Sequence, residues 1–268
     1  MAGPTPGRPG RRQEPAASTN SGTAGDASPR AAGRGAVWEN VKSVGGAIFI
    51  FLFVRLFIVE AFRIPSGSMV PTLLVGDWLF VNKLVYGPHI PFVAAHLPGY
   101  AEPKRGEVVV FVSPTQYDNG EDSTPTLVKR LWGLPGDTVY MRNGILHING
   151  TPYPQAPEFA VNEASPDFAD SSFTWQRKFA VAGSRFGPSP AQPTHDNWGP
   201  MLVPQRHFFM MGDNRYHSKD SRYWGFVPRD NLRGRPLFVY YSYDTESGLD
   251  YFRAVTEIRW TRIGHWIR

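Results

Sequence analysis

The feature that most constrains this chain is an apolar segment near its N-terminus that is long enough to cross a lipid bilayer. The run begins at Ser43 and ends at Val59, and seven consecutive large apolar residues, Ile48 to Val54, lie within it. A membrane-spanning helix needs roughly 20 residues. Neighbouring residues on both sides extend the run, so we predict a single transmembrane anchor over residues 37–62.

One charged residue, Arg55, interrupts this segment. An arginine at the centre of a bilayer costs about 2.5–3.5 kcal/mol on insertion scales, but Arg55 lies toward one end, where its side chain can extend to the headgroups. Two other interpretations stay open. Val59-Glu-Ala61 weakly resembles the cleavage site of a removable signal peptide, and a helix that is apolar all round is also typical of a protein core.

The residues before the apolar segment have a very different composition. Residues 1–36 are rich in Gly, Pro, Ala, Ser and Arg, and such a stretch cannot bury enough apolar surface to offset its ordering entropy. We predict a disordered tail there. Six basic and three acidic residues lie between Met1 and Lys42. The positive-inside rule then predicts a cytoplasmic tail and an extracytoplasmic domain over residues 63–268.

The composition excludes several classes of chemistry. The 268 residues include no cysteine, which excludes disulfides, thiol nucleophiles and cysteine–metal sites. The formal net charge is +5, from 28 basic and 23 acidic residues. The arginines are scattered, without a basic helix or a zinc-ligand pattern, so we expect no nucleic-acid partner. A modest basic excess is compatible with a surface that faces anionic lipid.

Beyond residue 63 the pattern is typical of β-structure, and we predict a mainly β, antiparallel domain. Asn143-Gly144 and Asn149-Gly150 each follow a short strand-like run and predict two successive tight hairpins. We predict strands over Trp78–Asn82, Glu107–Val112, Thr126–Leu131, Thr138–Met141, Ile145–Ile148, Phe208–Met211 and Leu237–Tyr243. Residues 151–205 contain few strand-like runs and are interpreted as a variable insertion that forms a small β or irregular subdomain.

Two hydroxyls follow the apolar segment, in Pro65-Ser66-Gly67-Ser68. Gly67 permits backbone geometry that other residues resist, so the pair can sit in a constrained turn. An ordinary polar turn explains the same residues. A serine becomes a nucleophile only when a base removes its proton.

Lys129 and His217 are the two candidate bases. Lys129 lies in a strand-like run, Leu127-Val-Lys-Arg-Leu-Trp132, where alternation can turn it inward. Burial lowers the pKa of a lysine, and only the neutral amine can accept a serine proton. His217 could form a triad with Ser68 and Asp213. Surface roles for both bases, and a metal site in the polar loop Gly212–Phe226, remain alternatives.

Several stretches together resemble the bacterial type I signal peptidases, or leader peptidases. They match four family motifs in the expected order: Phe62-Arg-Ile-Pro-Ser-Gly-Ser-Met-Val-Pro-Thr-Leu73, Arg105-Gly-Glu-Val-Val-Val-Phe111, Val128-Lys-Arg-Leu-Trp-Gly-Leu-Pro-Gly-Asp137 and Gly212-Asp-Asn-Arg-Tyr-His-Ser-Lys-Asp-Ser-Arg-Tyr-Trp-Gly-Phe-Val-Pro228. Four motifs in order are far more specific than any one of them.

The resemblance implies a serine endopeptidase in which Ser68 is the nucleophile and Lys129 the general base. It implies an oxyanion donor, Ser66, and supporting roles for Gly212, Ser218, Asp220 and Arg222. The residues it places in the substrate pockets are Phe62, Ile64, Met69, Leu73, Leu127 and Val128. It implies no cofactor and no metal.

The resemblance also implies a substrate, a location and a fold. The substrate is the signal peptide of exported preproteins, cut after a small-x-small sequence and bound as an added strand. The enzyme would lie in the bacterial plasma (inner) membrane beside the export machinery and contact lipid, with its catalytic domain on the periplasmic side. Its antiparallel β core would carry a smaller inserted subdomain. Tyr216-His217 departs from the Asp-Asn common in the last motif.

Two other functions are compatible with the sequence. The chain could be a non-catalytic, single-span anchor whose β domain binds an envelope partner. It could also be a Ser–Lys processing protease with one dedicated substrate.

Overall fold

The computed structural model describes residues 34–90, 93, 95–114, 126–155, 166–244 and 255–268. The tail expected at residues 1–36 lies outside this range, except that residues 34–36 belong to helix α1 (Arg34–Phe53). The chain divides into two compact units, residues 1–47 and 48–268. Helix α1 runs through the boundary between them.

The helix is long enough for a membrane anchor. It continues from α1 into a π-helical stretch, Val54–Ile58, and its apolar part, Trp38–Ile58, has 21 residues with no side chain buried. At 1.5 Å per residue this is roughly 30 Å, the thickness of the bilayer core. The helix ends at Ile58 rather than at the expected residue 62, because Val59–Arg63 forms strand β1 and pairs with β2 (Asp77–Asn82).

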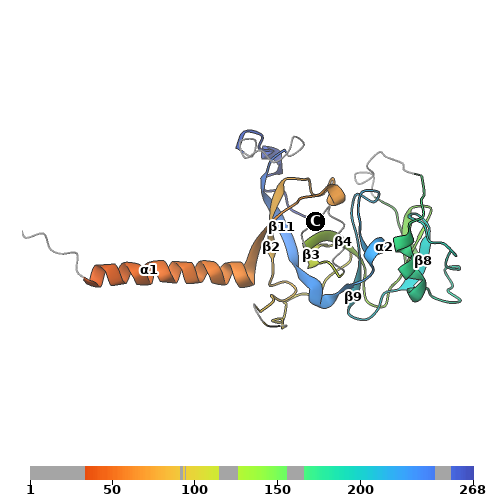
Figure 1. The fold of residues 1–268 in the computed structure, drawn as a ribbon, viewed down its shortest axis with the longest axis horizontal. Helices are drawn as coiled ribbons and strands as arrows, with labels where there is room; N and C mark the ends of the chain where they lie inside the picture. Colours follow the sequence, from red (N-terminus) through yellow and green to blue (C-terminus); the bar gives the residue numbers. More distant parts are fainter. Residues whose placement is uncertain (1–33, 91–92, 94, 115–125, 156–165, 245–254) are drawn as a thin grey trace, which may run out of the picture. The chain divides into compact units, whose positions relative to one another are not determined.

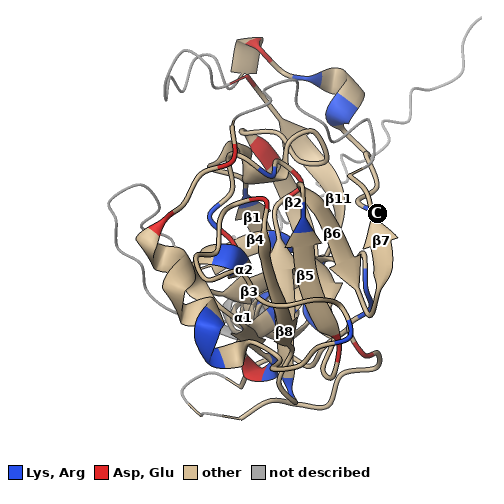
Figure 2. Cartoon of the chain, turned by 90° about the vertical axis from the view of Figure 1, so that its right-hand side faces the viewer, with Lys and Arg blue, Asp and Glu red and all other residues tan. Residues whose placement is uncertain are grey.

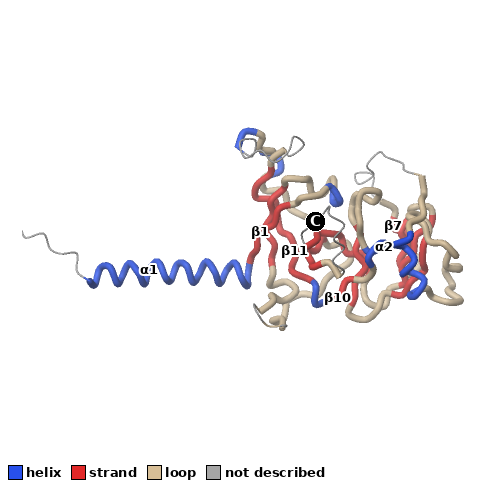
Figure 3. Tube along the Cα trace, viewed as in Figure 1, coloured by secondary structure: helices blue, strands red, loops and turns tan. Residues whose placement is uncertain are grey.

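Strands and loops dominate the chain after α1 (Figure 3). The larger sheet is antiparallel, with seven strands in the order β1-β2-β11-β3-β4-β9-β10. Figure 1 labels β2, β11, β3, β4 and β9 of this sheet. After β1 and β2, the bounds in that order are Leu232–Ser242, Val108–Val112, Thr126–Gly133, His207–Met211 and Val227–Pro228. The predicted mainly β, antiparallel fold is confirmed.

The smaller sheet has four strands in the order β7-β6-β5-β8. Their bounds are Thr151–Tyr153, Ile145–Ile148, Thr138–Arg142 and Trp198–Leu202. Both Asn-Gly pairs form its tight turns, since Asn143 and Asn149 have φ values of 49° and 53°, as such hairpins require. The predicted hairpins are confirmed. Half of this sheet comes from residues before 151, so the subdomain is larger than the insertion.

Short helices complete the described chain. They are the 3₁₀ helices η2 (Gly67–Met69), η4 (Ser171–Phe179), η5 (Arg229–Asn231) and η6 (Trp260–Arg262), and the short α2 (Ser221–Trp224). Basic and acidic segments are interspersed in the view of Figure 2.

All seven predicted strands are present, and four others, β1, β7, β8 and β10, are additional. Strand β11 begins at Leu232, five residues before its predicted start, and this additional part contains Gly234 and Pro236. Proline weakens a strand prediction, but the β11–β2 register shifts directly after Pro236, at a β-bulge. A Cβ at Gly234 would lie 2.3 Å from the Asn82 carbonyl oxygen, so the glycine permits this close approach.

Three hydrophobic clusters form the core. One joins the two sheets, because Phe209 and Met211 of β9 pack with Val139, Met141 and Trp198 of the smaller sheet. A second lies next to the serine turn and contains Ile64, Met69, Leu73, Leu79, Val81, Val108, Val110 and Val239. The third lies between β3, β4, β9 and α2. Apolar packing thus fixes the serine turn to the larger sheet.

Candidate active site

Ser68 lies in the short helix η2, in the turn that connects β1 to β2. Backbone hydrogen bonds close this turn, from Ile64 N–H to the Asp77 carbonyl at 2.8 Å and from Gly76 N–H to the Ile64 carbonyl at 3.0 Å. The Met69 side chain is 1% exposed and belongs to the core. The serine is therefore held in a rigid turn, with only 8% of its surface exposed.

Lys129 lies in β4, opposite Val109 of β3. It is 4% exposed, so of the two orientations that the sequence leaves open, the structure has the inward one. Its Nζ donates a hydrogen bond to Ser68 Oγ. The two residues are 61 positions apart in the sequence, and the sheet brings them into direct contact in a largely dry environment.

A cleft of about 190 Å³ opens onto this pair. It is lined by Phe62, Arg63, Ile64, Pro65, Ser66, Ser68, Met69, Thr126, Leu127, Val128 and Lys129. The lining includes the expected oxyanion donor and five of the six expected pocket residues. Leu73 is the exception, because it is fully buried in the adjoining hydrophobic cluster.

The last motif approaches the serine turn from the other side. Asn214 N–H donates to the Ser68 carbonyl at 3.1 Å, and its side-chain amide donates to the Gly67 carbonyl at 3.3 Å. A Cβ on Gly212 would lie 2.5 Å from the Ser68 carbonyl oxygen and 2.2 Å from Ser218 Oγ. Only glycine therefore allows this close approach of the loop to the nucleophile turn.

Asp220 and Arg222 form a fully buried ion pair, with Nε–Oδ1 and Nη2–Oδ2 distances of 2.8 and 2.9 Å. Asp220 Oδ2 also accepts from Gly212 N–H at 3.0 Å, so the pair holds the loop at its glycine. Burial alone would raise the pKa of Asp220, but the Arg222 guanidinium, its hydrogen bonds and the Gly212 N–H outweigh burial and lower this pKa.

Ser218 is buried at 3% exposure beside Gly212. Its Oγ has no hydrogen-bond partner among the described residues. A contact from this hydroxyl to the lysine stays a prediction.

A second buried ion pair, between Arg130 and Asp213, was not predicted from the sequence. It joins strand β4, the loop of the last motif and the nucleophile turn. Arg130 donates from Nε and Nη2 to the Asp213 carboxylate at 2.8 and 2.7 Å. Thr72, in the nucleophile turn, donates to the same carboxylate at 2.6 Å. The sequence did offer one signal for this pair: Lys129 and Arg130 are adjacent basic residues in an otherwise apolar strand. A buried charge requires a partner, so an acidic residue was to be expected nearby.

The alternative triad is not assembled. His217 is exposed, and its Nδ1 lies 3.3 Å from Asn214 Oδ1, while the Asp213 carboxylate is bound to Arg130. The described residues contain no group of three or more His, Asp or Glu side chains that could hold a metal ion.

Comparison with known proteins defines the class. The family model described as signal peptidase, peptidase S26, matches residues 37–241. A signal peptidase I from Pseudomonas fluorescens is 37% identical over 216 residues, which cover 76% of this chain and 72% of that protein. A signal peptidase I from Pseudomonas aeruginosa is also 37% identical with the same coverage.

The chain belongs to the signal peptidase family, peptidase S26. It is a serine peptidase of this family, and its apolar N-terminal helix is consistent with membrane anchoring. A crystal structure of a signal peptidase I from Enterococcus faecalis V583 is 27% identical, covers 50% of this chain and 96% of its own, and aligns with a TM-score of 0.30.

Proposed function

We propose that this chain is a membrane-anchored endopeptidase that removes signal peptides from preproteins, with Ser68 as nucleophile and Lys129 as general base. The buried hydrogen bond from Lys129 Nζ to Ser68 Oγ, at the floor of the cleft, is the observation that carries the proposal. A serine and its base within hydrogen-bond reach are the signature of an activated nucleophile.

The proposed reaction follows from this contact. The neutral Lys129 amine takes the hydroxyl proton as Ser68 Oγ attacks the scissile carbonyl, and a tetrahedral oxyanion forms. Ser66 Oγ and the Ser68 backbone N–H would donate to that oxyanion, and one such donor is typically worth about 2.7–4 kcal/mol. The lysine then returns the proton to the leaving amine. Water attacks the acyl-enzyme with the same base and releases the product.

The edge of β4 offers a place for an extended substrate. Thr126, Leu127 and Val128 pair with β3 on one side, whereas the pairing of β4 with β9 begins only at Arg130. Within the described chain no strand pairs with the other edge of residues 126–128. A peptide can add there as a strand, with its backbone bonds supplying affinity and alternate side chains entering pockets.

The cleft walls fit small side chains at the cleavage site. Phe62, Ile64, Met69, Leu127 and Val128 line it, and these large apolar side chains would contact the residues of a bound substrate. Leu73 supports the wall from within the hydrophobic cluster. We propose that this apolar wall contacts the small side chains of a small-x-small cleavage sequence.

The Ser68→Ala variant tests the proposed nucleophile. We expect it to leave a purified preprotein uncut, whereas the parent releases a mature product whose new N-terminus follows a small-x-small sequence. Ser171→Ala is the matched control, because Ser171 is exposed in η4, and we expect it to retain parental activity. Parental cleavage by Ser68→Ala would exclude the dyad.

The non-catalytic alternative makes the opposite prediction, since an anchor that only binds an envelope partner needs no nucleophile. The buried Ser68–Lys129 pair favours the peptidase. A lysine is almost never fully buried without a partner or a function.

We further propose that α1 holds the site at the outer face of the plasma membrane, beside the export machinery. An aromatic face supports lipid contact. On β2 and β11, Phe80 stacks on Tyr240 at 4.2 Å and lies 5.7 Å from Phe238, which in turn lies 5.6 Å from the exposed Trp266. Such amphipathic rings are enriched at the membrane interface. Substrates released at that surface would then meet the site.

Single-cysteine labelling tests this topology, because the chain has no cysteine of its own. In intact cells of a diderm host with a permeable outer membrane, a membrane-impermeant thiol reagent should label Ser171→Cys and leave Ser18→Cys unlabelled until the inner membrane is broken. The reverse pattern would invert the proposed orientation.

A further inference from the structure

We propose that His195, a residue of the 151–205 insertion, is a positioning residue for the catalytic loop: it acts as the hydrogen-bond acceptor that fixes Arg222, and through Arg222 the loop against Ser68. This inference rests on the proposed function of Ser68 and Lys129. It assigns to the insertion a role in catalysis, through a side chain that does not touch the substrate cleft.

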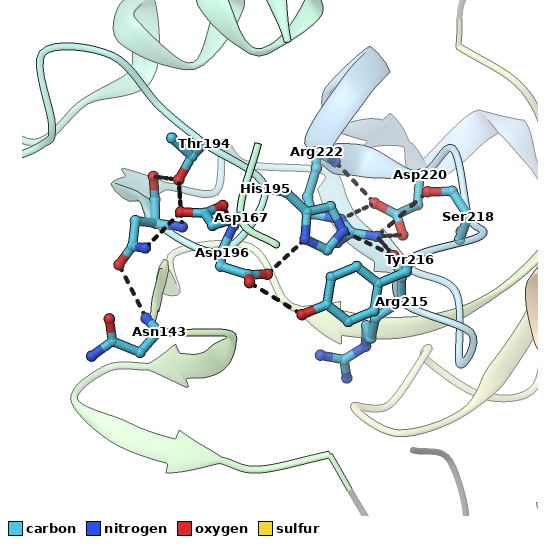
Figure 4. A network of polar contacts seen from close by, with 11 residues as sticks. Asn143, Asp167, Thr194, His195, Asp196, Arg215, Tyr216, Ser218, Asp220 and Arg222 are labelled. Carbon is cyan, nitrogen blue, oxygen red and sulfur yellow. Dashed lines mark hydrogen bonds and ion pairs between the residues drawn. The ribbon is translucent and has the colours of Figure 1, made fainter. Parts of the chain in front are cut away.

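His195 is a buried member of the polar network drawn in Figure 4. The imidazole is 1% exposed. Its Nε2 receives a hydrogen bond from Arg222 Nη1, and its Nδ1 lies 2.6 Å from Asp196 Oδ1. An arginine only donates and a carboxylate only accepts. Nε2 also lies 3.0 Å from the Arg215 carbonyl oxygen, but that oxygen already accepts from Arg222 Nη2. Because Arg222 Nη1 can only donate, we infer that the ring carries its proton on Nδ1 and presents the Nε2 lone pair to Arg222.

The neutral form is the one that fits this place. Protonation would put an N–H and a positive charge on Nε2, directly against the guanidinium. Burial and the charge of Arg222 both lower the pKa of His195, against the opposite effect of the Arg215 carbonyl and the Asp196 carboxylate. The surroundings therefore keep an acceptor at this position.

Stacking and hydrogen bonds fix the orientation of the imidazole. Phe168 and Tyr216 stack on it, with centroid distances of 5.0 and 4.6 Å. Tyr216 also donates its hydroxyl to Asp196 Oδ2 at 3.1 Å, and the backbone N–H of Asp196 donates to Asp167 at 2.9 Å. Three of these residues come from the insertion, so its folding sets the direction of the lone pair.

Arg222 connects His195 to the loop that contacts Ser68. Besides its pair with Asp220, it donates from Nη2 to the Arg215 carbonyl at 2.5 Å. Asp220 holds Gly212, and the loop between Gly212 and Arg215 reaches the nucleophile turn through the bond from Asn214 to Ser68. A guanidinium without its acceptor at Nη1 would reorient and shift both ends of this loop.

The network also gives a role to a departure from the family pattern. Tyr216 stands where the family motif commonly has an aspartate, and here its ring covers His195 while its hydroxyl binds Asp196. The catalytic loop and the 151–205 insertion therefore contact each other directly through Tyr216. Neither His195 nor Asp196 could be selected from the sequence, because the insertion resembles no motif.

Two variants separate the acceptor from the packing. His195→Phe keeps an aromatic ring and removes the acceptor, whereas His195→Gln keeps an amide oxygen that can accept from Arg222. A misplacement near 1 Å can cost about 100-fold in rate. We expect His195→Phe to lower kcat by roughly 10- to 100-fold with a KM near the parental value. His195→Gln should recover most of that loss.

His207→Phe is the matched control, because its ring bonds only the Gln205 carbonyl among the contacts described, at 2.8 Å; we expect parental kcat and KM. Thermal unfolding of each variant is measured alongside, and kcat is taken at a temperature where all are folded. A parental kcat for a folded His195→Phe, an effect confined to KM, or a His195→Gln no better than His195→Phe would each overturn the proposal.

A measurement without turnover covers the case in which His195→Phe does not fold. In ¹⁵N-histidine spectra of the Ser68→Ala protein, we expect the His195 ring to be neutral with its proton on Nδ1. A proton on Nε2, or a charged ring at neutral pH, would overturn the proposal whatever the activity data. Cleavage by Ser68→Ala would instead refute the proposed function and leave the histidine tautomer unaffected.

Discussion

Replacing Lys129 with methionine is expected to lower kcat by about 10²- to 10⁴-fold, the range that a positioned general base contributes. Methionine has similar length and fills the same buried space on β4, but it cannot accept the Ser68 proton. The cleft should still bind substrate, since its other walls do not change, so KM should stay near the parental value. Preprotein cleavage under single-turnover conditions measures the chemical step.

Lys129→Arg separates a base from a charge. Arginine keeps a cation at the site but stays protonated in proteins, so this variant should be as inactive as Lys129→Met. The matched control is Lys178→Met, because Lys178 is exposed in η4, and it should retain parental kcat. If Lys129→Arg cleaved at the parental rate, the lysine would act through its charge, and the proposed base would be wrong.

The sequence predicted the Ser68–Lys129 pair of this site, but it did not predict the Arg130–Asp213 ion pair beside it. Ser68 and Lys129 lie in motifs whose order is specific, and the strand pattern around Lys129 left both an inward and a surface orientation open; its 4% exposure shows the inward one. Its neighbour Arg130 is also buried, at 7%, although alternation along a strand predicts that neighbours face opposite sides. The Asp213 partner compensates this burial, and such partners are set by tertiary structure.

Two of the four additional strands, β7 and β8, were missed for the same physical reason. β7 and β8 contain Pro152 and Pro200, and proline argues against a strand because it cannot donate to the ladder. Both are edge strands of the smaller sheet, where a missing donor is tolerated. β1 follows the helix without a glycine or proline to mark the change, and pairing with β2 decides its conformation.

Replacing Arg130 with methionine is expected to lower the free energy of unfolding by about 3–5 kcal/mol, the typical cost of removing one partner of a buried ion pair. The Asp213 carboxylate, 2% exposed, would stay buried without the guanidinium that binds it twice. Arg130 also donates from Nη1 to the Gly106 carbonyl at 2.6 Å and the Arg268 carbonyl at 2.9 Å, so those acceptors lose a donor as well. Denaturant unfolding of the detergent-solubilised protein measures the change.

Two further variants show whether the buried charge is the cause. Asp230→Asn removes a partner of Arg206 from an ion pair whose side chains are 69% and 64% exposed, and it should cost no more than about 1 kcal/mol. Arg130→Met combined with Asp213→Leu removes both buried charges, and it should be more stable than Arg130→Met alone, since no carboxylate is then left unpaired. If the double variant were the less stable of the two, packing and the remaining hydrogen bonds of Asp213, rather than its uncompensated charge, would account for the loss.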